Sequence, residues 1–338
     1  MGTTPKVSII IPVFNGSNYL SEAIDSALAQ TYQNIEIIVV NDGSDDGGKT
    51  ETAARSYGNE IRYFSKENGG VASALNFGIG QMTGEWFVWL SHDDFFSKNR
   101  IEEDINIIKN NSDARIIFCK LDIINENGKL IEEIIYPINK ITNAREVLEL
   151  GGVDVDMCSM TIHKSCFNEV GLFDEKNRTT QDTQMLLLLS SHFPFYLNSK
   201  SIMYRRDHKE RGTYTLSEQH KKDLLYLCDF IHDKLSVDNF FPEVKNNPNS
   251  TSDALVWMGF FYYLRGASNH ADECFHKSVY HEKNILKKII ITFKITSRII
   301  IIQYKEKRKK LLMAIIPSPI YLFLRNIKRT LIKIVQNE

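Results

Sequence analysis

Two adjacent carboxylates, Asp93 and Asp94, lie just beyond the apolar run Trp86–Leu90. A short, nearly continuous apolar run is typical of a strand buried on both faces, and ligands of an open parallel sheet bind beyond the carboxyl ends of such strands. Adjacent carboxylates repel each other, and a divalent cation relieves that repulsion. Oxygen ligands suit Mg²⁺ or Mn²⁺ on a diphosphate. The two adjacent aspartates therefore predict a metal site. The alternative is that they belong to a solvated turn that precedes a helix beginning near Lys98.

The elements that must position these carboxylates alternate between strands and helices. Apolar, β-branched runs predict strands at Val7–Phe14, Ile35–Val40 and Ile61–Phe64, and at the run that leads to Asp93. Helical periodicity predicts helices at Tyr19–Gln30, Lys49–Tyr57, Val71–Gln81 and Lys98–Asn110. Strands that alternate with helices of this length indicate βαβ units and a parallel sheet with helices on both faces.

The pattern changes after residue 110. Two apolar runs at 114–124 and 129–135 flank Asn127-Gly128, which predicts an antiparallel hairpin. Further elements are expected as a helix at Asn143–Leu150, a strand at Met157–His163, a helix at Gln181–Ser190 and a last strand at Ile202–Arg206. Residues 216–282 are expected to be helical, with an ordinary helical hairpin favoured over a peptide-binding repeat. The predicted organisation is a catalytic domain at 1–215, a helical hairpin region at 216–282 and a basic amphipathic tail at 283–338.

The composition of the chain indicates a globular protein of a reducing compartment. The chain has 338 residues, and a hydrophobic content of 43% is enough to form a core. Its five cysteines are scattered and contain no C-x-x-C pair, which argues against a disulfide framework or zinc site and favours a reducing compartment. A strand-like segment begins within ten residues of Met1, so no secretory signal is expected.

The charge of the chain is concentrated at one end. From Tyr280 onward there are fourteen lysines and arginines and only three glutamates, although the net charge of the whole chain is −1. The same segment holds two apolar stretches that cannot readily span a bilayer. The Ile-rich stretch Asn284–Tyr304 is interrupted by lysines and an arginine, and Leu311–Leu324 contains two prolines and is too short. This combination predicts an amphipathic anchor on the cytoplasmic face of a membrane, with a buried helix pair as the alternative. Nucleic acid is disfavoured, because the tail has few of the aromatics that stack on bases.

Several ordered motifs resemble glycosyltransferase family two, whose members use nucleotide sugars. They are the segment Val7–Asn15 (VSIIIPVFN), the segment Ile37–Ser44 (IIVVNDGS), Asn68-Gly69-Gly70 with Asn76 and Gly78, and Ser91-His92-Asp93-Asp94. The resemblance covers about residues 5 to 210. It implies an α/β fold of the GT-A type, with a Rossmann-like, mixed and mainly parallel sheet and, in this chain, a C-terminal helical appendage.

The resemblance also implies roles for residues on the donor side. Asp42 matches the acid that holds the nucleotide base, usually uracil, and the loop flanking the nucleotide corresponds to Pro12, Phe14 and Asn15. Asp93 matches the last acid of the D-x-D motif, which binds Mn²⁺ or Mg²⁺ on the diphosphate, and Asp94 is expected to line the sugar pocket. Ser91 stands where the first acid of that motif is usual, so fewer carboxylates are available to the metal.

Two later segments resemble the rest of the family's site. Gly171-Leu172-Phe173-Asp174-Glu175, followed by Gln181-Asp182, resembles the G-x-F-D-E…E-D pattern, with glutamine in place of the first acid of the final pair. That pattern implies that Asp182 is the catalytic base, because an acceptor hydroxyl needs a positioned carboxylate to take its proton. Tyr204–His208 resembles the Y-R-x-H segment, which implies that His208 approaches the diphosphate or the metal, with a surface histidine as the alternative.

These features lead to an expected function. The chain is expected to be an inverting, non-processive enzyme that moves a sugar from a nucleotide donor, UDP being favoured, to a glycan or lipid-linked acceptor in cell-surface polysaccharide synthesis. No Q-x-x-R-W motif of processive members is present. A sugar nucleotidyltransferase is disfavoured, because Pro12–Gly16 lacks a Gly- and Arg-rich phosphate loop. An inactive scaffold in a glycan assembly complex is the remaining alternative. The loss of an acid at Ser91 suggests it, whereas the retained Asp93, Asp94 and Asp182 argue against it.

Overall fold

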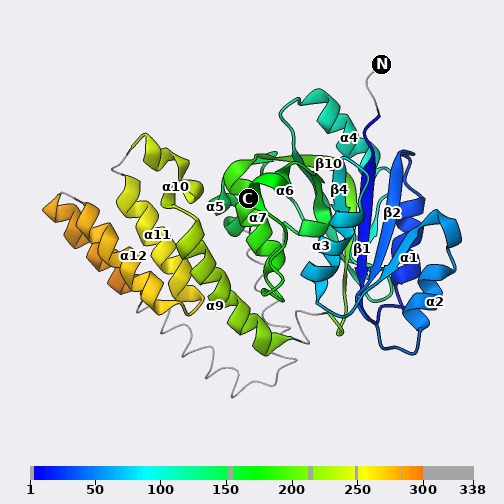
Figure 1. The fold of residues 1–338 in the computed structure, drawn as a ribbon. Coiled ribbons are helices and arrows are strands. Elements are labelled where there is room, and N and C mark those ends of the chain that lie inside the picture. The colour runs from blue at the N-terminus through cyan, green and yellow to red at the C-terminus, as the bar shows by residue number, and fades with distance from the viewer. Residues whose placement is uncertain (1–3, 151–154, 212–215, 248–249, 283, 300–338) are drawn as a thin grey trace. The chain divides into compact units, whose positions relative to one another are not determined.

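The computed structural model of the chain describes residues 4–150, 155–211, 216–247, 250–282 and 284–299 (Figure 1). The chain divides into two compact units. The first comprises Met1–Asn246 and Arg265–Ala267, and the second comprises Asn247–Leu264 and Ser268–Glu338. The site considered below lies wholly within the first unit.

The first unit is built on a ten-stranded mixed sheet, with strand order β3-β2-β1-β4-β9-β6-β10-β5 and with β7 beside β6 and β8 beside β10. Its strands are β1 Val7–Val13, β2 Ile35–Asn41, β3 Arg62–Ser65, β4 Trp86–Trp89, β5 Phe95–Phe96, β6 Ile116–Asn125, β7 Leu130–Glu133, β8 Lys140–Ile141, β9 Met160–His163 and β10 Phe195–Asp207. Strands β3, β2, β1 and β4 pair in parallel, as do β6 and β10. Strand β9 runs antiparallel between β4 and β6.

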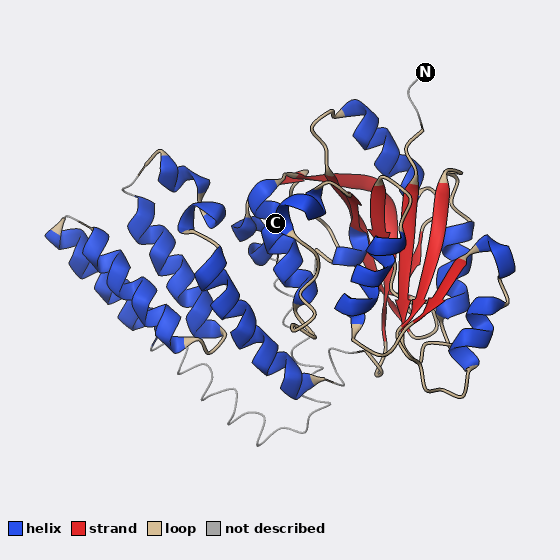
Figure 2. Cartoon of the chain, viewed as in Figure 1, coloured by secondary structure: helices blue, strands red, loops and turns tan. Residues whose placement is uncertain are grey.

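Helices cover both faces of this sheet (Figure 2). The helices of the first unit are α1 Leu20–Leu28, α2 Lys49–Arg55, α3 Val71–Gln81, α4 Arg100–Asn110, α5 Ala144–Glu149, α6 Cys166–Val170, α7 Gln181–His192, α9 Ser217–Lys234 and α10 Val237–Phe240, with short 3₁₀ turns η1 Gly58–Glu60, η2 Met157–Ser159 and η3 Pro242–Lys245. The mixed sheet with flanking helices confirms the α/β fold class, and its first half follows the predicted order of strands and helices.

The core lies between the central strands and these helices. Every residue of β1 is buried, as its unbroken apolar run predicts. Helix α3 approaches β1 closely because Gly78 faces Ile10, where a Cβ atom would come within 2.6 Å of an Ile10 methyl carbon. A larger residue at position 78 would push α3 away from the sheet.

The structure extends the predicted last strand of this unit. Strand β10 begins at Phe195 rather than at Ile202, and its register with β6 shifts between Asn198 and Ile202. Asn198 and Ser201 are buried there, and Asn198 Nδ2 donates hydrogen bonds to Asp104 Oδ1 and Ser201 Oγ. The polar residues at this bulge hide the strand from a periodicity argument, because their side chains are satisfied by tertiary partners. The two-residue strands β5 and β8 were likewise not predicted.

The second unit is helical in the part that the structure describes. Helices α11 Thr251–Leu264 and α12 Ser268–His281 pack against each other as a hairpin (Figure 1). The rings of Phe260 and Phe275 meet edge to face, with centroids 5.1 Å apart. Gly259 makes this contact possible, because a Cβ atom there would lie 2.3 Å from the Phe275 ring.

Residues 285–299 form a further helix of this unit. No helix within the described ranges is long and apolar enough to cross a bilayer. The rest of the predicted basic tail, residues 300–338, lies outside the described residues.

Candidate active site

The carboxyl ends of the parallel strands gather most of the residues singled out in the sequence. Asp42 follows β2, Asp93 and Asp94 follow β4, and His208 follows β10. Their strands run in the same direction, so these side chains emerge at one edge of the sheet, where ligands of such sheets bind.

Asp93 and His208 form the centre of this edge. His208 Nε2 donates a 2.8 Å hydrogen bond to Asp93 Oδ2, and the two side chains are only 7% and 15% exposed, respectively. Burial on its own would raise the pKa of the Asp93 carboxyl, but the hydrogen bond from His208 and the nearby charge of Arg211 together outweigh it and hold that pKa below its usual range. The His208 ring lies beside Tyr19, the N-cap residue of α1, with centroids 5.3 Å apart. The structure therefore brings His208 to the acid of the D-x-D-like motif.

Asp94 has a different environment from its neighbour. It is 5% exposed, and its Oδ1 accepts a 2.8 Å hydrogen bond from the backbone N–H of Arg206. Burial raises the pKa of Asp94 well above its usual range, and the adjacent charge of Asp93 adds to this rise. Of the two adjacent acids, Asp93 is thus the one that carries the negative charge, while Asp94 favours its protonated form.

Arg206 holds this pair in place and was not singled out in the sequence. Its side chain is 2% exposed, and its guanidinium donates to the backbone oxygens of Asp93 at 3.0 Å and Glu126 at 3.0 Å and to Glu22 Oε2 at 2.5 Å. It also lies over the Tyr19 ring, 4.5 Å from the centroid. Arg206 therefore ties the turn after β4 to α1 and to the end of β6.

Ser91 and His92 precede Asp93 in that turn, and His92 interacts electrostatically with the Asp93 carboxylate. Ser91 Oγ lies 3.5 Å from Cys158 Sγ. The His92 ring packs against Gly16, where a Cβ atom would come within 2.2 Å of the ring. Burial lowers the pKa of His92, so this imidazole is neutral at pH 7. Gly16 of the loop after β1 is therefore required for His92 to fit.

Asp42 organises the loop that precedes α3. Its carboxylate accepts hydrogen bonds from Lys66 Nζ at 2.8 Å and from the backbone N–H groups of Gly69 at 3.0 Å and Gly70 at 2.7 Å. A carboxylate offers about four acceptor positions, so about one remains for a ligand. Gly43 follows with a φ of +72°, and a Cβ atom there would lie 2.6 Å from Asn68 N. The local backbone thus depends on glycine at position 43.

The loop after β1 presents two of its three predicted residues to solvent. Phe14 is 45% exposed and Asn15 is exposed, whereas Pro12 is buried within β1. Asn15 adopts a φ of +50°, and its side chain exchanges hydrogen bonds with Asp45, which stabilise this unusual backbone conformation.

Asp182 is the second residue of α7 and is half-buried. Its Oδ1 accepts a 2.7 Å hydrogen bond from the Thr183 N–H. Withdrawal from water raises the pKa of Asp182 to about 6, and the charge of Asp156 adds to the rise. A carboxylate with this pKa is ionised at pH 7 and is a stronger base than an ordinary aspartate.

Gln181, the departure from the E-D pattern, is 6% exposed. Its Oε1 atom is buried and has no hydrogen-bond partner among the described residues. A glutamate there would place a charge in the same buried position, so the neutral amide is the less costly side chain.

Asp156 and Arg211 are two further charged residues of this region that the sequence did not single out. Asp156 precedes η2, caps it by accepting the Cys158 N–H, and lies with its Oδ2 3.6 Å from Arg205 Nη1. Its charge raises the pKa of both Asp94 and Asp182, so it lies near both. Asp156 belongs to none of the motifs recognised in the sequence, and it is the fold that brings it near the other acids.

Burial works against the charge of Arg211, which follows His208 in a turn closed by its N–H to the His208 carbonyl. Four nearby carboxylates together outweigh that effect and raise the pKa of Arg211; they belong to Asp94, Asp156, Asp93 and Asp207. A permanent cation thus lies close to the acids of the site.

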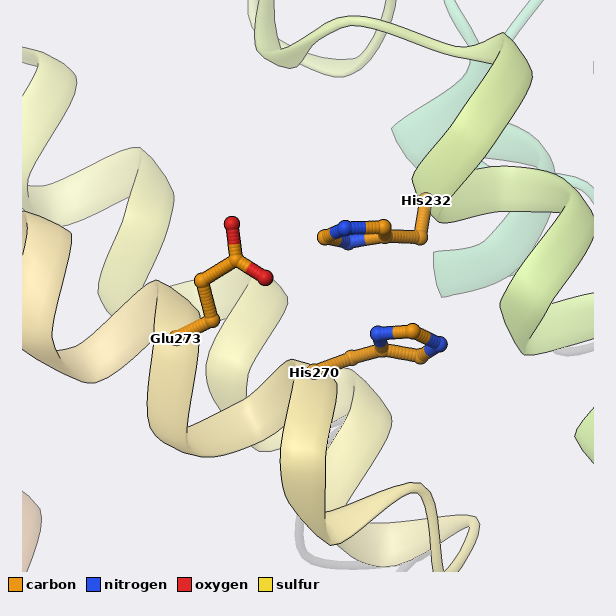
Figure 3. Close-up of side chains that lie close together, drawn as sticks. All are labelled: His232, His270 and Glu273. Atoms are coloured by element: carbon orange, nitrogen blue, oxygen red, sulfur yellow. The ribbon is translucent and has the colours of Figure 1, made fainter.

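Figure 3 draws three other side chains, His232 of α9 with His270 and Glu273 of α12. His270 and Glu273 are three residues apart and therefore lie on one side of α12. Helices α9 and α12 belong to different compact units, and no site is assigned to these residues.

The mixed sheet, together with Asp42, Asp93 and Asp94 at the carboxyl ends of its parallel strands, defines a GT-A-type protein. The sequence model of "Glycosyl transferase family 2" matches residues 8–169, which include β2, β4, Asp93 and all of β1 except Val7. The chain belongs to glycosyltransferase family 2, as the relatives below also indicate.

Two similar sequences are uncharacterized glycosyltransferases of Rickettsia. The protein of Rickettsia felis is 45% identical over 235 residues, which cover 68% of this chain and 38% of that protein. The protein of Rickettsia typhi is 43% identical over 221 residues, which cover 64% of this chain and 68% of that protein. The chain thus spans less than half the length of some of its relatives.

Among solved structures, the chain is similar to residues 1–349 of S. aureus TarS in complex with UDP-GlcNAc. The TM-score is 0.56 at 16% sequence identity, and the match covers 82% of this chain and 81% of that one. At this identity the likeness concerns the fold, and it supports the GT-A type.

Proposed function

We propose that the chain is an inverting glycosyltransferase that moves a sugar from a UDP-sugar to a glycan or lipid-linked acceptor in cell-surface polysaccharide synthesis. The observation that carries the proposal is the raised pKa of the Asp182 carboxyl, about 6. The charge of Asp156 contributes to this rise and also to the raised pKa of Asp94. Family membership and a UDP-GlcNAc complex of the TarS fold support a nucleotide-sugar donor.

In the proposed reaction, Asp182 acts as the general base. It removes the proton of an acceptor hydroxyl while that oxygen forms a bond to the anomeric carbon of the donor sugar. The bond from the anomeric carbon to the diphosphate oxygen breaks, and the bonding electrons leave with UDP. One displacement from the opposite side inverts the anomeric configuration. The sequence lacks the Q-x-x-R-W motif of processive members, so we propose one transfer per encounter.

The leaving diphosphate gathers negative charge that must be offset. Asp93 Oδ2 and His208 Nε2 lie at one point, and in the tautomer that lacks a proton on Nε2 they would form a carboxylate–imidazole donor pair that fits Mn²⁺. When bound, such a cation offsets the charge of the leaving group. Because Ser91 replaces the usual first acid, we propose that Arg211 adds positive charge on the same side.

The donor nucleotide is proposed to bind at the neighbouring strand ends. Asp42 retains about one acceptor position for the imide N–H of uracil. The exposed Phe14 and Asn15 flank the same loop region, and a phenyl ring can stack on a base.

A panel of nucleotide sugars, beginning with UDP-GlcNAc, tests the proposal through release of the nucleoside diphosphate with Mn²⁺ or Mg²⁺. We expect turnover of at least one UDP-sugar, and we expect Asp182→Asn to lower that turnover by about 10²–10⁴-fold while UDP affinity stays near normal. Glu218→Gln, on the exposed start of α9, is the matched control. Absence of turnover with every donor, despite UDP binding, would favour the inactive scaffold.

We also propose that the C-terminal part holds the chain on the cytoplasmic face of a membrane. In the helix at 285–299, one face exposes large apolar side chains; these are Ile285, Leu286, Ile289, Ile290 and Phe293. Lys287, Lys288 and Lys294 flank that face, while Ile291 and Ile295 are buried. An apolar face bordered by lysines fits the headgroup region of an anionic membrane.

Sedimentation of the full chain with anionic liposomes, at low and high salt, tests this membrane contact. Serine at positions 286, 289 and 293 should weaken the salt-resistant part of binding, because apolar burial does not depend on ionic strength. The control is Tyr280→Ser, which removes an exposed aromatic outside this helix. Equal binding of all three proteins at high salt would contradict the role of the apolar face, and absence of liposome binding by the full chain would end the membrane proposal.

A further inference from the structure

The loop that leads into α7 is held together by its own side chains. Asn177 is fully buried, and its Oδ1 accepts hydrogen bonds from the Thr180 N–H at 3.0 Å and the Thr180 hydroxyl at 2.9 Å. Its Nδ2 donates to Gln184 Oε1 at 2.7 Å. Residues 177–180 are thereby tied to the first turns of α7, which carry Asp182.

The same loop is bound from outside by one residue of α9, Asp223. Asp223 is 3% exposed, and its Oδ2 accepts hydrogen bonds from the Arg178 N–H at 3.2 Å and the Thr179 hydroxyl at 2.8 Å. Its backbone oxygen lies 3.3 Å from the Thr180 hydroxyl, whose proton is directed mainly to the closer Asn177 Oδ1. Gln219, one turn earlier in α9, donates to Asp223 Oδ1 at 2.7 Å. The Asp223 carboxylate thus joins two successive loop residues, Arg178 and Thr179, to α9, and hydrogen bonds to a carboxylate are stronger than neutral ones.

Other residues on this face of α9 extend the contact. His220 Nδ1 lies 3.1 Å from the Thr179 hydroxyl, which already donates to Asp223 and therefore accepts from His220. Tyr226 donates a 2.6 Å hydrogen bond to Asp174 Oδ2 at the start of the loop. His220, Asp223 and Tyr226 are spaced three residues apart, which places them on one face of the helix.

The loop also touches the donor side of the sheet. The Arg178 guanidinium donates a hydrogen bond to the backbone oxygen of Gly69. A Cβ atom at Gly70 would come within 2.3 Å of Arg178 Nη1, so this approach requires glycine. The N–H groups of Gly69 and Gly70 bind Asp42, so the loop connects α9 with the proposed nucleotide site.

We infer that Asp223 is a positioning residue, which sets the place of the Asp182 carboxylate by fixing the N-terminus of α7. The inference rests on the proposed function, in which Asp182 is the general base. Thr180 and Asp182 are two residues apart, so a shift of the loop is passed directly to the base. A displacement of about 1 Å can cost about 10²-fold in rate.

The test compares Asp223→Ala and Asp223→Asn with the control Glu218→Gln, by UDP-sugar turnover and UDP affinity. Asp223→Ala removes every side-chain bond to the loop, and we expect kcat to fall about 10- to 10²-fold with UDP affinity changed less than about threefold. Asp223→Asn keeps an oxygen that can accept from Arg178 and Thr179, so it should recover most of that loss. Glu218 pairs only with Lys221 among the described residues, and its replacement should leave kcat unchanged.

A second comparison separates positioning from a general effect on folding. If Asp223 acts through Asp182, Asp223→Ala should cause no further loss of kcat in the Asp182→Asn background. An equal fold-loss in both backgrounds would overturn the inference. If Asp223→Ala does not fold, Thr179→Val takes its place. It removes the hydroxyl that bonds to Asp223, and its loss of kcat is compared in the wild-type and Asp182→Asn backgrounds. Wild-type turnover of Asp182→Asn alone would instead refute the base assignment, a result distinct from the failure of Asp223.

Discussion

The pKa of Asp182 leads to a prediction about the pH dependence of transfer. The base must be deprotonated to accept a proton, so kcat/KM should fall as the pH drops below about 6. At pH 5 about one tenth of the molecules would hold an ionised Asp182, so the rate should be about tenfold below its plateau. An aspartate at its ordinary pKa of 3.8 would keep about nine tenths of the rate at that pH.

A substitution that removes the charge of Asp156 tests whether the raised pKa of Asp182 sets the pH dependence. Its negative charge contributes to the raised pKa of Asp182, so Asp156→Asn should move the acidic limb of the profile to lower pH. Asparagine retains an oxygen at the position that caps the Cys158 N–H, so the change removes the charge and keeps the local fold.

The assay is UDP release at donor concentrations well below KM, measured from pH 4.5 to 8.5, because kcat/KM reports on the free enzyme. Thermal unfolding at each pH excludes loss of folded protein as the cause of the limb. Glu218→Gln removes a distant, exposed carboxylate and should leave the profile unchanged. A wild-type limb near pH 4, or a limb that Asp156→Asn does not move, would refute the reasoning.

Three other predictions follow from the same structure. Asp42→Ala should weaken UDP binding about tenfold or more in calorimetry, since it releases the loop at Gly69; unchanged affinity would remove Asp42 from the nucleotide site. Asp93→Asn should abolish most turnover and blunt the response to Mn²⁺, whereas full wild-type activity in excess EDTA would contradict the metal assignment. Burial would raise the pKa of Glu36, but hydrogen bonds from Ser8 and other groups lower it to about 2. Glu36→Gln should therefore cost about 2 kcal/mol in urea unfolding at pH 7, and the difference from wild type should shrink as pH falls from 4.5 to about 2; a constant difference would count against this pairing.

The local elements of the first half could be predicted because their signals are local. The apolar run of β1 and the glycines before α3 act through short-range propensity and burial, and α3 begins and ends where its pattern predicts. The bulged strand β10 could not be predicted, because the buried side chain of Asn198 is satisfied by Asp104, which is 94 residues away in sequence. A periodicity argument has no access to such partners.

The ordered motifs of the sequence by themselves determined the family, the fold class and the candidate acids Asp42, Asp93 and Asp182, since each motif is contiguous and follows a recognisable strand or turn. Only the tertiary structure decided how these acids are tuned. The hydrogen bond from His208 to Asp93, the nearby charge of Asp156 and the bonds of Asp223 all join residues that are far apart in the chain. Electrostatic and hydrogen-bonding effects depend on distances in space, and sequence spacing does not encode those distances between separate elements.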